Sequence, residues 1–403
     1  MTPPTLNSLR MPISYTSHVF SSRLPASLAH NRISVAADAA RARAPLADLT
    51  ESNPTVVGLA YPAEAIRAAL AAPGALVYEP TPHGLPSARA AVAAYYARHG
   101  VAVDPARITL TASTSEAYSW IFKLLCDPGD DVLVPSPSYP LFDHLAALES
   151  VRPVVYPLRY HAGWFVDVEE VRRALTPRTR ALFVVNPNNP TGHFLKRDEA
   201  RALAALAAER ELALVSDEVF ADYAFAPDGA RVTTLAGDSP ALTFCLSGLS
   251  KVVGLPQLKL GWIVAGGPDA RRAAAAERLE LIADTYLSVA APVQHAAPAL
   301  LALVDDVGAQ IAARVRENRA TLAAALAGSA AQLYDAEGGW SAIVRLPSTH
   351  TEEEWTLLLL DDGVLVHPGF FFDLPPTTLV ISLLVAPPIL ARGLAAILRR
   401  CTH

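Results

Sequence analysis

Short runs of β-branched and aliphatic residues alternate with helical patterns through the middle of the chain. The strand-like runs lie at 108–110, 131–134, 153–156, 181–185, 212–215, 242–246 and 262–265. The first five are separated by segments with helical periodicity, such as 116–125 and 197–210. This alternation is typical of α/β layering around a mostly parallel sheet. We therefore expect one large domain at 46–290.

The pattern changes after this region. Residues 268–328 have the Ala-rich composition of long helices, which would connect the large domain to the C-terminal part of the chain. Beyond them, strand-like runs at 339–346, 364–366 and 379–384 alternate with helical segments at 352–361 and 388–400. This predicts a smaller α+β domain at 291–403, to which an N-terminal arm at 1–45 contributes. The expected fold class is α/β: a large domain with a mostly parallel sheet flanked by helices, plus the smaller α+β domain.

Composition narrows the class of protein. The chain has 403 residues, of which 52% are hydrophobic and 18% charged, which is enough apolar material for a large core. The formal net charge is -6, and Lys and Arg form no block. We therefore expect neither nucleic acid nor an anionic membrane surface as a partner.

Cysteine usage and hydropathy suggest a location. Cys126, Cys245 and Cys401 are odd in number and lack the spacing of a zinc site, so we expect no disulfide framework and no bound metal. No stretch is expected to reach the roughly 20 apolar residues of a membrane span, and the first thirty residues lack the apolar core of a signal peptide. These features predict a cytoplasmic protein.

Polar residues follow several predicted strands, and ligands of open α/β sheets collect at the carboxyl ends of the strands. The run at 108–110 leads into Thr111-Ala-Ser-Thr-Ser-Glu116, which brings hydroxyls and backbone N–H groups to the start of a helix. Such a segment can bind an anion, aided by the helix dipole. Alternatively, Ser113 or Thr114 simply caps the helix, with Glu116 completing a capping box.

Two further strand ends carry suggestive residues. The run at 181–185 leads into Asn186-Pro-Asn-Asn-Pro-Thr-Gly192, a rigid turn whose amides can donate hydrogen bonds, or no more than a turn. The run at 212–215 leads into Ser216-Asp217-Glu-Val-Phe220. A carboxylate after a buried strand is costly unless a cation meets it, so Asp217 should have a cationic partner. The alternative to a functional role is that Asp217 forms an ordinary salt bridge.

Lys251 ends the run Ser247-Gly-Leu-Ser-Lys251, which follows an apolar strand and precedes more apolar residues. An amine in such surroundings is shifted toward its neutral, nucleophilic form. A solvated surface lysine is the alternative.

NPNNPTG, SDEVF and SGLSK, in this order and at these separations, resemble the class I/II aminotransferases of the fold type I pyridoxal phosphate (PLP) enzymes. The resemblance runs from about residue 45 to the C-terminus. It implies PLP as cofactor and gives Lys251 the role of the lysine that forms a Schiff base with it and shuttles the substrate proton. It also implies that Asp217 pairs with the pyridine nitrogen, where two charges about 4 Å apart at an effective dielectric near 20 attract by roughly 4 kcal/mol. Asn189 resembles the amide that binds the ring hydroxyl.

The remaining roles follow from the same resemblance. Tyr139 is similar to the aromatic residue that stacks on the pyridine ring, with packing into the core as the alternative. Tyr78 resembles the tyrosine that reaches the phosphate of the neighbouring subunit, which implies a homodimer with shared sites, although a surface tyrosine is the alternative. The phosphate ligands implied by the resemblance are Thr114, Ser115, Ser247 and Lys259.

Four positions depart from the family pattern. Phe220 stands where many relatives have a tyrosine, Lys259 where an arginine is common, and Gly248 where a serine often contacts phosphate, a contact that Ser247 could replace. In the C-terminal domain, Val380 stands where the family usually has the arginine that binds the substrate α-carboxylate. We therefore expect either that Arg32 or Arg345 binds the carboxylate, or that the substrate makes no conventional α-carboxylate contact.

The resemblance implies a PLP-dependent aminotransferase that acts on a small-molecule amino donor and oxo acceptor. The alternative is another PLP enzyme, namely a lyase, a decarboxylase or a condensing enzyme of a biosynthetic pathway. A non-catalytic binding module is disfavoured by the presence of Lys251, Asp217 and Asn189. A nicotinamide-dependent dehydrogenase is disfavoured because no GxGxxG follows an early strand.

Overall fold

The computed structural model describes residues 20–25 and 29–402. Its largest unit is an eight-stranded sheet in the order β2-β9-β8-β7-β6-β3-β4-β5. From β8 to β4 neighbouring strands are parallel, whereas β9 and β5 pair with their neighbours in the antiparallel sense. The strands are β2 (Ile108–Thr111), β3 (Asp131–Ser136), β4 (Arg152–Tyr160), β5 (Trp164–Val166), β6 (Thr179–Val185), β7 (Ala213–Asp217), β8 (Thr243–Gly248) and β9 (Gly261–Gly266). The expected α/β fold with a mostly parallel sheet is confirmed.

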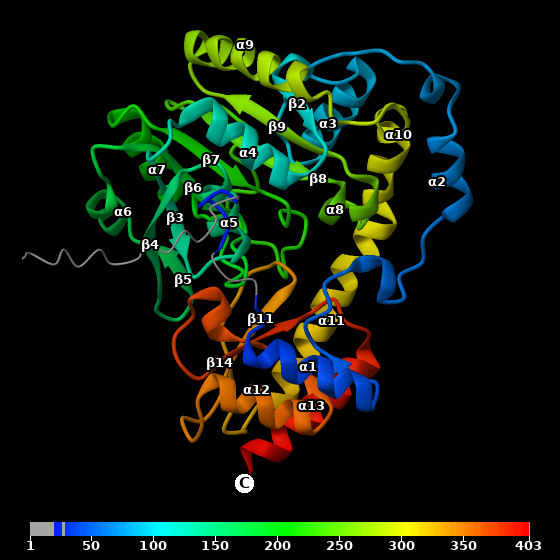
Figure 1. Cartoon of the computed structure of the whole chain (residues 1–403), viewed down its shortest axis with the longest axis vertical. Helices are drawn as coiled ribbons and strands as arrows, with labels where there is room; N and C mark the ends of the chain where they lie inside the picture. Colours follow the sequence, from blue (N-terminus) through cyan, green and yellow to red (C-terminus); the bar gives the residue numbers. More distant parts are fainter. Residues whose placement is uncertain (1–19, 26–28, 403) are drawn as a thin grey trace, which may run out of the picture.

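Helices cover both faces of this sheet (Figure 1). Every residue of β8 is buried, and its side chains alternate between two cores. Phe244 and Leu246 contribute to the core shared with α4, α5 and α9, while Cys245 contributes to the core shared with α3 and α10. A central parallel strand buried on both faces accounts for the continuous apolar run at 242–246. The helices of these layers are α3 (Pro86–Arg98), α4 (Thr114–Leu125), α5 (Leu141–Leu148), α6 (Val168–Ala174), α7 (Arg197–Glu209), α9 (Asp269–Tyr286) and α10 (Ala291–Leu301).

A second, smaller unit lies at the other end of the molecule (Figure 1). Its antiparallel sheet has the order β10-β11-β14-β13 and packs against three helices. The two-residue strands β1 and β12 pair in parallel next to it, so the segment around Ala47 shares a core with the C-terminal part of the chain. The predicted domain boundaries stay a prediction. The elements are β1 (Ala47–Asp48), β10 (Gln332–Leu333), β11 (Ser341–Arg345), β12 (Val364–Leu365), β13 (His367–Pro368), β14 (Thr378–Ser382), α11 (Val307–Leu326), α12 (Glu352–Asp361) and α13 (Pro387–Cys401).

The remaining helical elements are short or peripheral. α1 packs on α12, and α2 lies at the edge of the molecule beside α10 (Figure 1). A four-residue helix, α8, follows β8 directly. The bounds are α1 (Arg32–Arg43), α2 (Ala63–Leu70), α8 (Leu249–Val252), η1 (Pro54–Val56), η2 (Pro73–Leu76), η3 (Pro105–Arg107), η4 (Pro256–Leu258), η5 (Ala302–Asp305) and η6 (Gly369–Phe372).

Two expectations from the sequence were incomplete or wrong. The three-residue strand β5 was not expected, because its pattern is too short to stand out. The expectation that no stretch is apolar enough to span a membrane is also wrong. Residues 291–326 meet the length and hydropathy criteria for a span, since they contain an 18-residue window of mean hydropathy 1.4. This stretch covers α10, η5 and α11, and 44% of the window is buried inside the molecule. A core helix of a soluble protein passes the same test, so the stretch is weak evidence for a membrane span.

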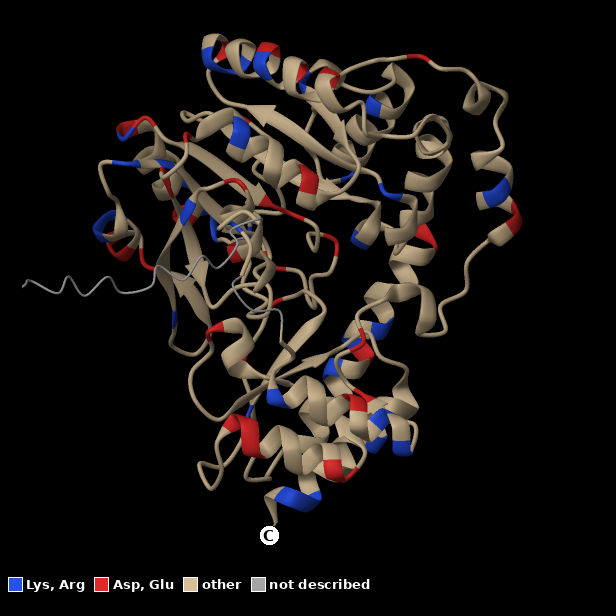
Figure 2. Ribbon diagram, in the orientation of Figure 1, with Lys and Arg blue, Asp and Glu red and all other residues tan. Residues whose placement is uncertain are grey.

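Charged residues of both signs alternate over the outer helices, as Figure 2 shows for α9. The three cysteines are free thiols. Within residues 20–25 and 29–402, no group of three or more His, Cys, Asp or Glu side chains could hold a metal ion.

Candidate active site

A cleft of about 380 Å³ lies at the carboxyl edge of the large sheet, where it meets the small sheet. Strands β2, β8, β7, β6 and β3 all end at this edge, and seven of the residues predicted for the site line the cleft. These seven are Thr114, Ser115, Tyr139, Asn189, Asp217, Lys251 and Lys259. They come from separate loops, so the parallel sheet itself brings them together.

Asp217 is the last residue of β7, and its carboxylate accepts two hydrogen bonds. The Tyr118 hydroxyl donates to Oδ2 at 2.8 Å, and the Val219 N–H donates to Oδ1 at 3.2 Å. Burial raises the pKa of Asp217 above its ordinary value, although the Tyr118 bond opposes this rise. No ion pair to Asp217 within 4.0 Å exists in the described part of the chain. An ordinary salt bridge therefore does not account for a carboxylate at this buried position.

Lys251 lies in α8, directly after β8, and its amine faces an aromatic wall. The Nζ atom is 5.0 Å from the centroid of Trp340 and 5.9 Å from that of Phe220. Burial lowers the pKa of Lys251, and the nearby Asp217 charge only partly opposes this. The lysine is therefore shifted toward its neutral form, as the sequence predicted.

The start of α4 lies next to these residues at the cleft. Ser113 is the N-cap, and its Oγ accepts from the Glu116 N–H at 3.1 Å, so the capping alternative is right for Ser113. The expected capping box is wrong, because the Glu116 carboxylate accepts from the Ala112 N–H at 2.6 Å instead. The N–H groups of Thr114 and Ser115 make no hydrogen bond within the described residues, as expected in a first helical turn. A Cβ at Gly261 would lie 2.9 Å from the Ser113 carbonyl carbon and 3.0 Å from the Thr114 nitrogen, so this close approach requires glycine.

Asn189 lies in the loop after β6, and its Oδ1 accepts from the Ser341 hydroxyl at 3.0 Å. Its side-chain NH₂ makes no hydrogen bond within the described residues and remains free to donate into the cleft. The loop is held to the small unit because the N–H groups of Glu337 and Gly338 both donate to the Gly192 carbonyl at 3.1 Å. Gly192 has φ +70°, and a Cβ there would lie 2.5 Å from the Gly338 oxygen.

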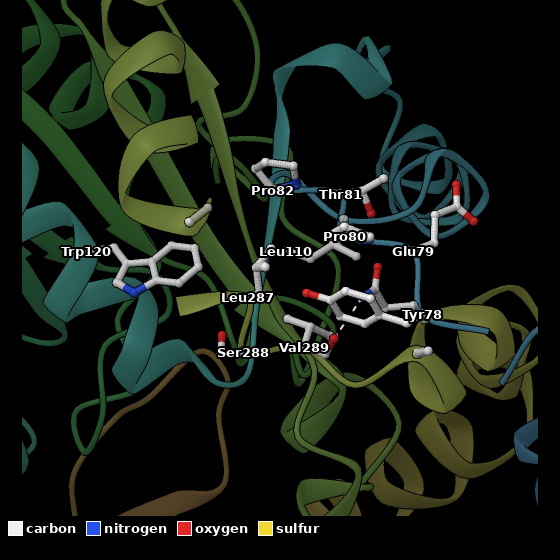
Figure 3. A pocket seen from close by; sticks show the side chains of 14 residues that line it. Tyr78, Glu79, Pro80, Thr81, Pro82, Leu110, Trp120, Leu287, Ser288 and Val289 are labelled. Atoms are coloured by element: carbon white, nitrogen blue, oxygen red, sulfur yellow. Dashed lines mark hydrogen bonds between the residues drawn. The ribbon is translucent and has the colours of Figure 1, made fainter. Parts of the chain in front are cut away.

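Two predicted residues do not line the cleft. Ser247 is 1% exposed and lies on the same face of β8 as Cys245. Ser250, the second residue of α8, lines the cleft instead. Tyr78 is 80% exposed and lines a separate pocket, where it lies near Val289 (Figure 3). The roles predicted for both residues stay predictions.

The proposed carboxylate ligands also lie elsewhere. Arg32, on α1, forms an exposed ion pair with Glu353 at 3.6 Å, and the exposed Arg345 does not line the cleft. Val380 does line it and is 2% exposed. Among the residues lining the cleft, the basic side chains are Lys251, Lys259 and His367.

Sequence reasoning missed several cleft residues, among them Tyr118, Trp340 and His367. Tyr118 lies one turn after Thr114 and Ser115 on α4, so helical spacing could have indicated it. Trp340 and His367 come from the small unit. No local signal places them beside Lys251 or Val380, because the docking of the two units decides these contacts.

The chain is similar to proteins of known family. The family model for class I and II aminotransferases matches residues 45–397. Glutamate-pyruvate aminotransferase AlaA of Escherichia coli (strain K12) is 33% identical over 215 residues, 53% of each chain. An alanine aminotransferase of Mycobacterium tuberculosis (strain H37Rv) is 32% identical over 251 residues, covering 62% of this chain and 58% of the relative. The chain thus spans little more than half the length of these curated relatives.

Solved structures are similar over most of the chain. An aminotransferase from Escherichia coli superposes with a TM-score of 0.84 at 26% identity, covering 95% of this chain and 98% of the other. Aspartate aminotransferase from Thermus thermophilus with maleate gives a TM-score of 0.81 at 26% identity, covering 94% and 99%.

Proposed function

We propose that this chain, which belongs to the class I and II aminotransferase family, transfers an amino group between an amino donor and an oxo acceptor with PLP as cofactor. Members of this family use PLP. The observation that carries the proposal is the pairing, in one cleft, of a lysine with a lowered pKa and a buried carboxylate that accepts hydrogen bonds but forms no ion pair with any residue that the structure describes.

The cleft residues fit PLP chemically. The free N–H groups of Thr114 and Ser115, together with the Lys259 ammonium, would hold the phosphate at the start of α4. Asp217 would meet the ring nitrogen, and the free Asn189 amide would donate to the ring hydroxyl. When bound, PLP supplies an aldehyde that condenses with amines and an electron sink for the carbanion formed at the substrate carbon.

The protein's own groups have defined tasks. The Lys251 amine acts as the base that takes the proton from the substrate carbon bearing the nitrogen. Its lowered pKa suits this role, because a base must be unprotonated near neutral pH. Tyr118 holds Asp217 in position and stabilises its charged form, which a cationic ring nitrogen would stabilise further. Tyr139, which is 50% exposed at the cleft, would cover one face of the ring.

The relatives suggest a substrate class. Their names indicate alanine, glutamate and pyruvate as reactants, and we propose an α-amino acid donor with a 2-oxo acid acceptor. Recognition of the donor is unusual, because the apolar Val380 stands where the family usually has an arginine. This substitution also keeps a second candidate open, a PLP-dependent lyase, decarboxylase or condensing enzyme.

Borohydride reduction tests the lysine assignment. In protein purified with PLP, hydride treatment should add the cofactor's mass to the peptide containing Lys251, and a Lys251→Ala variant should show no such addition. Mass on another lysine would reject the assignment.

Stopped-flow absorbance with a panel of amino donors then separates the two candidate functions. Transamination predicts accumulation of the amine form of the cofactor and release of an oxo acid. Turnover without the amine form would favour the lyase or decarboxylase candidate.

We also propose a homodimer with shared sites. Leu76, Val77 and Tyr78 form a run of exposed apolar side chains, 94%, 58% and 80% exposed, and such runs commonly mark interfaces. Mixing Tyr78→Ala protein with Lys251→Ala protein should restore activity that neither has alone, because one site of the mixed dimer keeps both residues. A mixture no more active than its components would contradict shared sites. A cytoplasmic location stays a prediction.

A further inference from the structure

We propose that His367, together with the Ser382 hydroxyl, binds the carboxylate of the substrate. This inference rests on the proposed function and names the donor-recognition residue of the same cleft. It starts from the wall contributed by the small sheet, where Ser341, Val380, Ser382 and His367 all line the cleft.

The sheet register places His367 next to the apolar position. His367 on β13 pairs directly with Val380 on β14, so both side chains project from the same face of the sheet. Ser382 lies two residues beyond Val380 and therefore projects from that face as well. His367 is only partly buried and lines the cleft beside Val380.

Hydrogen-bonding capacity favours the same pair. Neither ring nitrogen of His367 has a hydrogen-bond partner among the described residues, and the ring contacts Phe372 edge-on at 5.7 Å between centroids. The Ser382 Oγ accepts from the Leu384 N–H at 3.2 Å, which leaves its own O–H free to donate. The Ser341 hydroxyl, in contrast, already donates to Asn189.

The charges around His367 allow its imidazole ring to take up a proton when an anion binds beside it. Burial lowers its pKa, and the charge of Asp48 on β1 partly opposes this. Asp48 itself is held by Thr50 and lies 3.4 Å from Arg41. Strand β14 carries no ionisable side chain, and Glu352 on α12 is bonded to Thr378. A carboxylate against the ring would therefore raise the pKa of His367 and favour uptake of a proton from solvent.

Binding of 2-aminoisobutyrate to the PLP-loaded protein tests this without transamination, because this amino acid has no hydrogen on its α-carbon. tert-Butylamine is the matched probe, because it also lacks that hydrogen and has a methyl group in place of the carboxylate. The cofactor's absorbance reports binding of both, and isothermal titration in two buffers reports proton uptake. We expect His367→Leu to weaken 2-aminoisobutyrate binding about 10- to 100-fold and to leave tert-butylamine binding within about twofold.

The proton readout separates recognition from loss of structure. Near pH 8, wild-type protein should take up more protons with 2-aminoisobutyrate than with tert-butylamine, and His367→Leu should abolish this difference. The control His161→Leu changes an exposed histidine outside the cleft and should behave as wild type.

Equal weakening of both probes, or unchanged 2-aminoisobutyrate binding in His367→Leu, would overturn the inference. Equal affinity of the wild type for the two probes would overturn it as well. A wild type that binds the carboxylate through His367 but never yields the amine form of the cofactor would reject transamination and leave the inference standing.

Discussion

Replacing Glu218 by glutamine tests how burial controls ionisation beside Asp217. Glu218 is 2% exposed, and its carboxyl group accepts from the Thr234 hydroxyl at 2.6 Å and the Leu235 N–H at 2.7 Å. Burial raises its pKa from 4.5 to about 7, because these two bonds only partly offset the loss of water. A glutamine keeps the shape and can accept from Leu235, and its NH₂ can donate to Thr234.

The sign of the pH effect follows from the raised pKa. Below pH 4.5 the side chain is protonated in both the folded and unfolded states. As pH rises from 4.5 to about 7, the unfolded state loses its proton first, so folding becomes less favourable. At 1.36 kcal/mol per pH unit, the full loss is about 3.4 kcal/mol, of which about 2.5 kcal/mol falls between about pH 5 and pH 8.5.

Urea unfolding of wild type and Glu218→Gln at these two pH values, at one fixed protein concentration, measures this loss. The glutamine variant lacks the titration, so its free energy of unfolding relative to wild type should increase by about 2.5 kcal/mol at the higher pH. Glu317→Gln, an exposed position on α11, should show no such change. A difference between wild type and Glu218→Gln that is the same at both pH values would refute the reasoning.

Three further changes test other contacts. Tyr118→Phe removes the donor 2.8 Å from Asp217. Because a hydrogen bond to a charged group contributes about 1.5–3 kcal/mol, PLP binding should weaken about 10-fold or more in an absorbance titration. Unchanged affinity would contradict the role of Tyr118. Gly261→Ala places a Cβ 2.9 Å from Thr111 Oγ1. It should lower the free energy of unfolding in urea by about 1–3 kcal/mol and also weaken PLP binding. Normal stability with normal affinity would contradict this, because the loop before α4 would then move aside without cost. Contacts with His193 and Lys196 outweigh burial and lower the pKa of Glu337 to about 2. Glu337→Gln should therefore destabilise the fold at neutral pH by about 1–2 kcal/mol after solvent screening at this half-buried site. In urea unfolding, the difference from wild type should shrink as pH falls from 4.5 toward 2, and a pH-independent difference would contradict this.

The amino-acid sequence by itself determined the layered fold and most of the large-domain side of the cleft. Apolar runs such as 242–246 are long enough to identify buried strands, and parallel strands must end at a common edge. Residues at or just beyond the ends of those strands, such as Asp217 and Lys251, therefore had to converge whatever the details of packing. Ser247 was predicted at the site only from the family resemblance, as a substitute for the serine replaced by Gly248, whereas the serine that lines the cleft here is Ser250.

Only the tertiary structure decided the contacts between segments far apart in the chain. Tyr118 reaches Asp217 across 99 residues of sequence, and Trp340 meets Lys251 because the small unit docks on the large sheet. The pairing of His367 with Val380 depends on the register of two short strands. No local pattern encodes such contacts, because they depend on the packing of whole layers, in which many side chains share the free energy of burial.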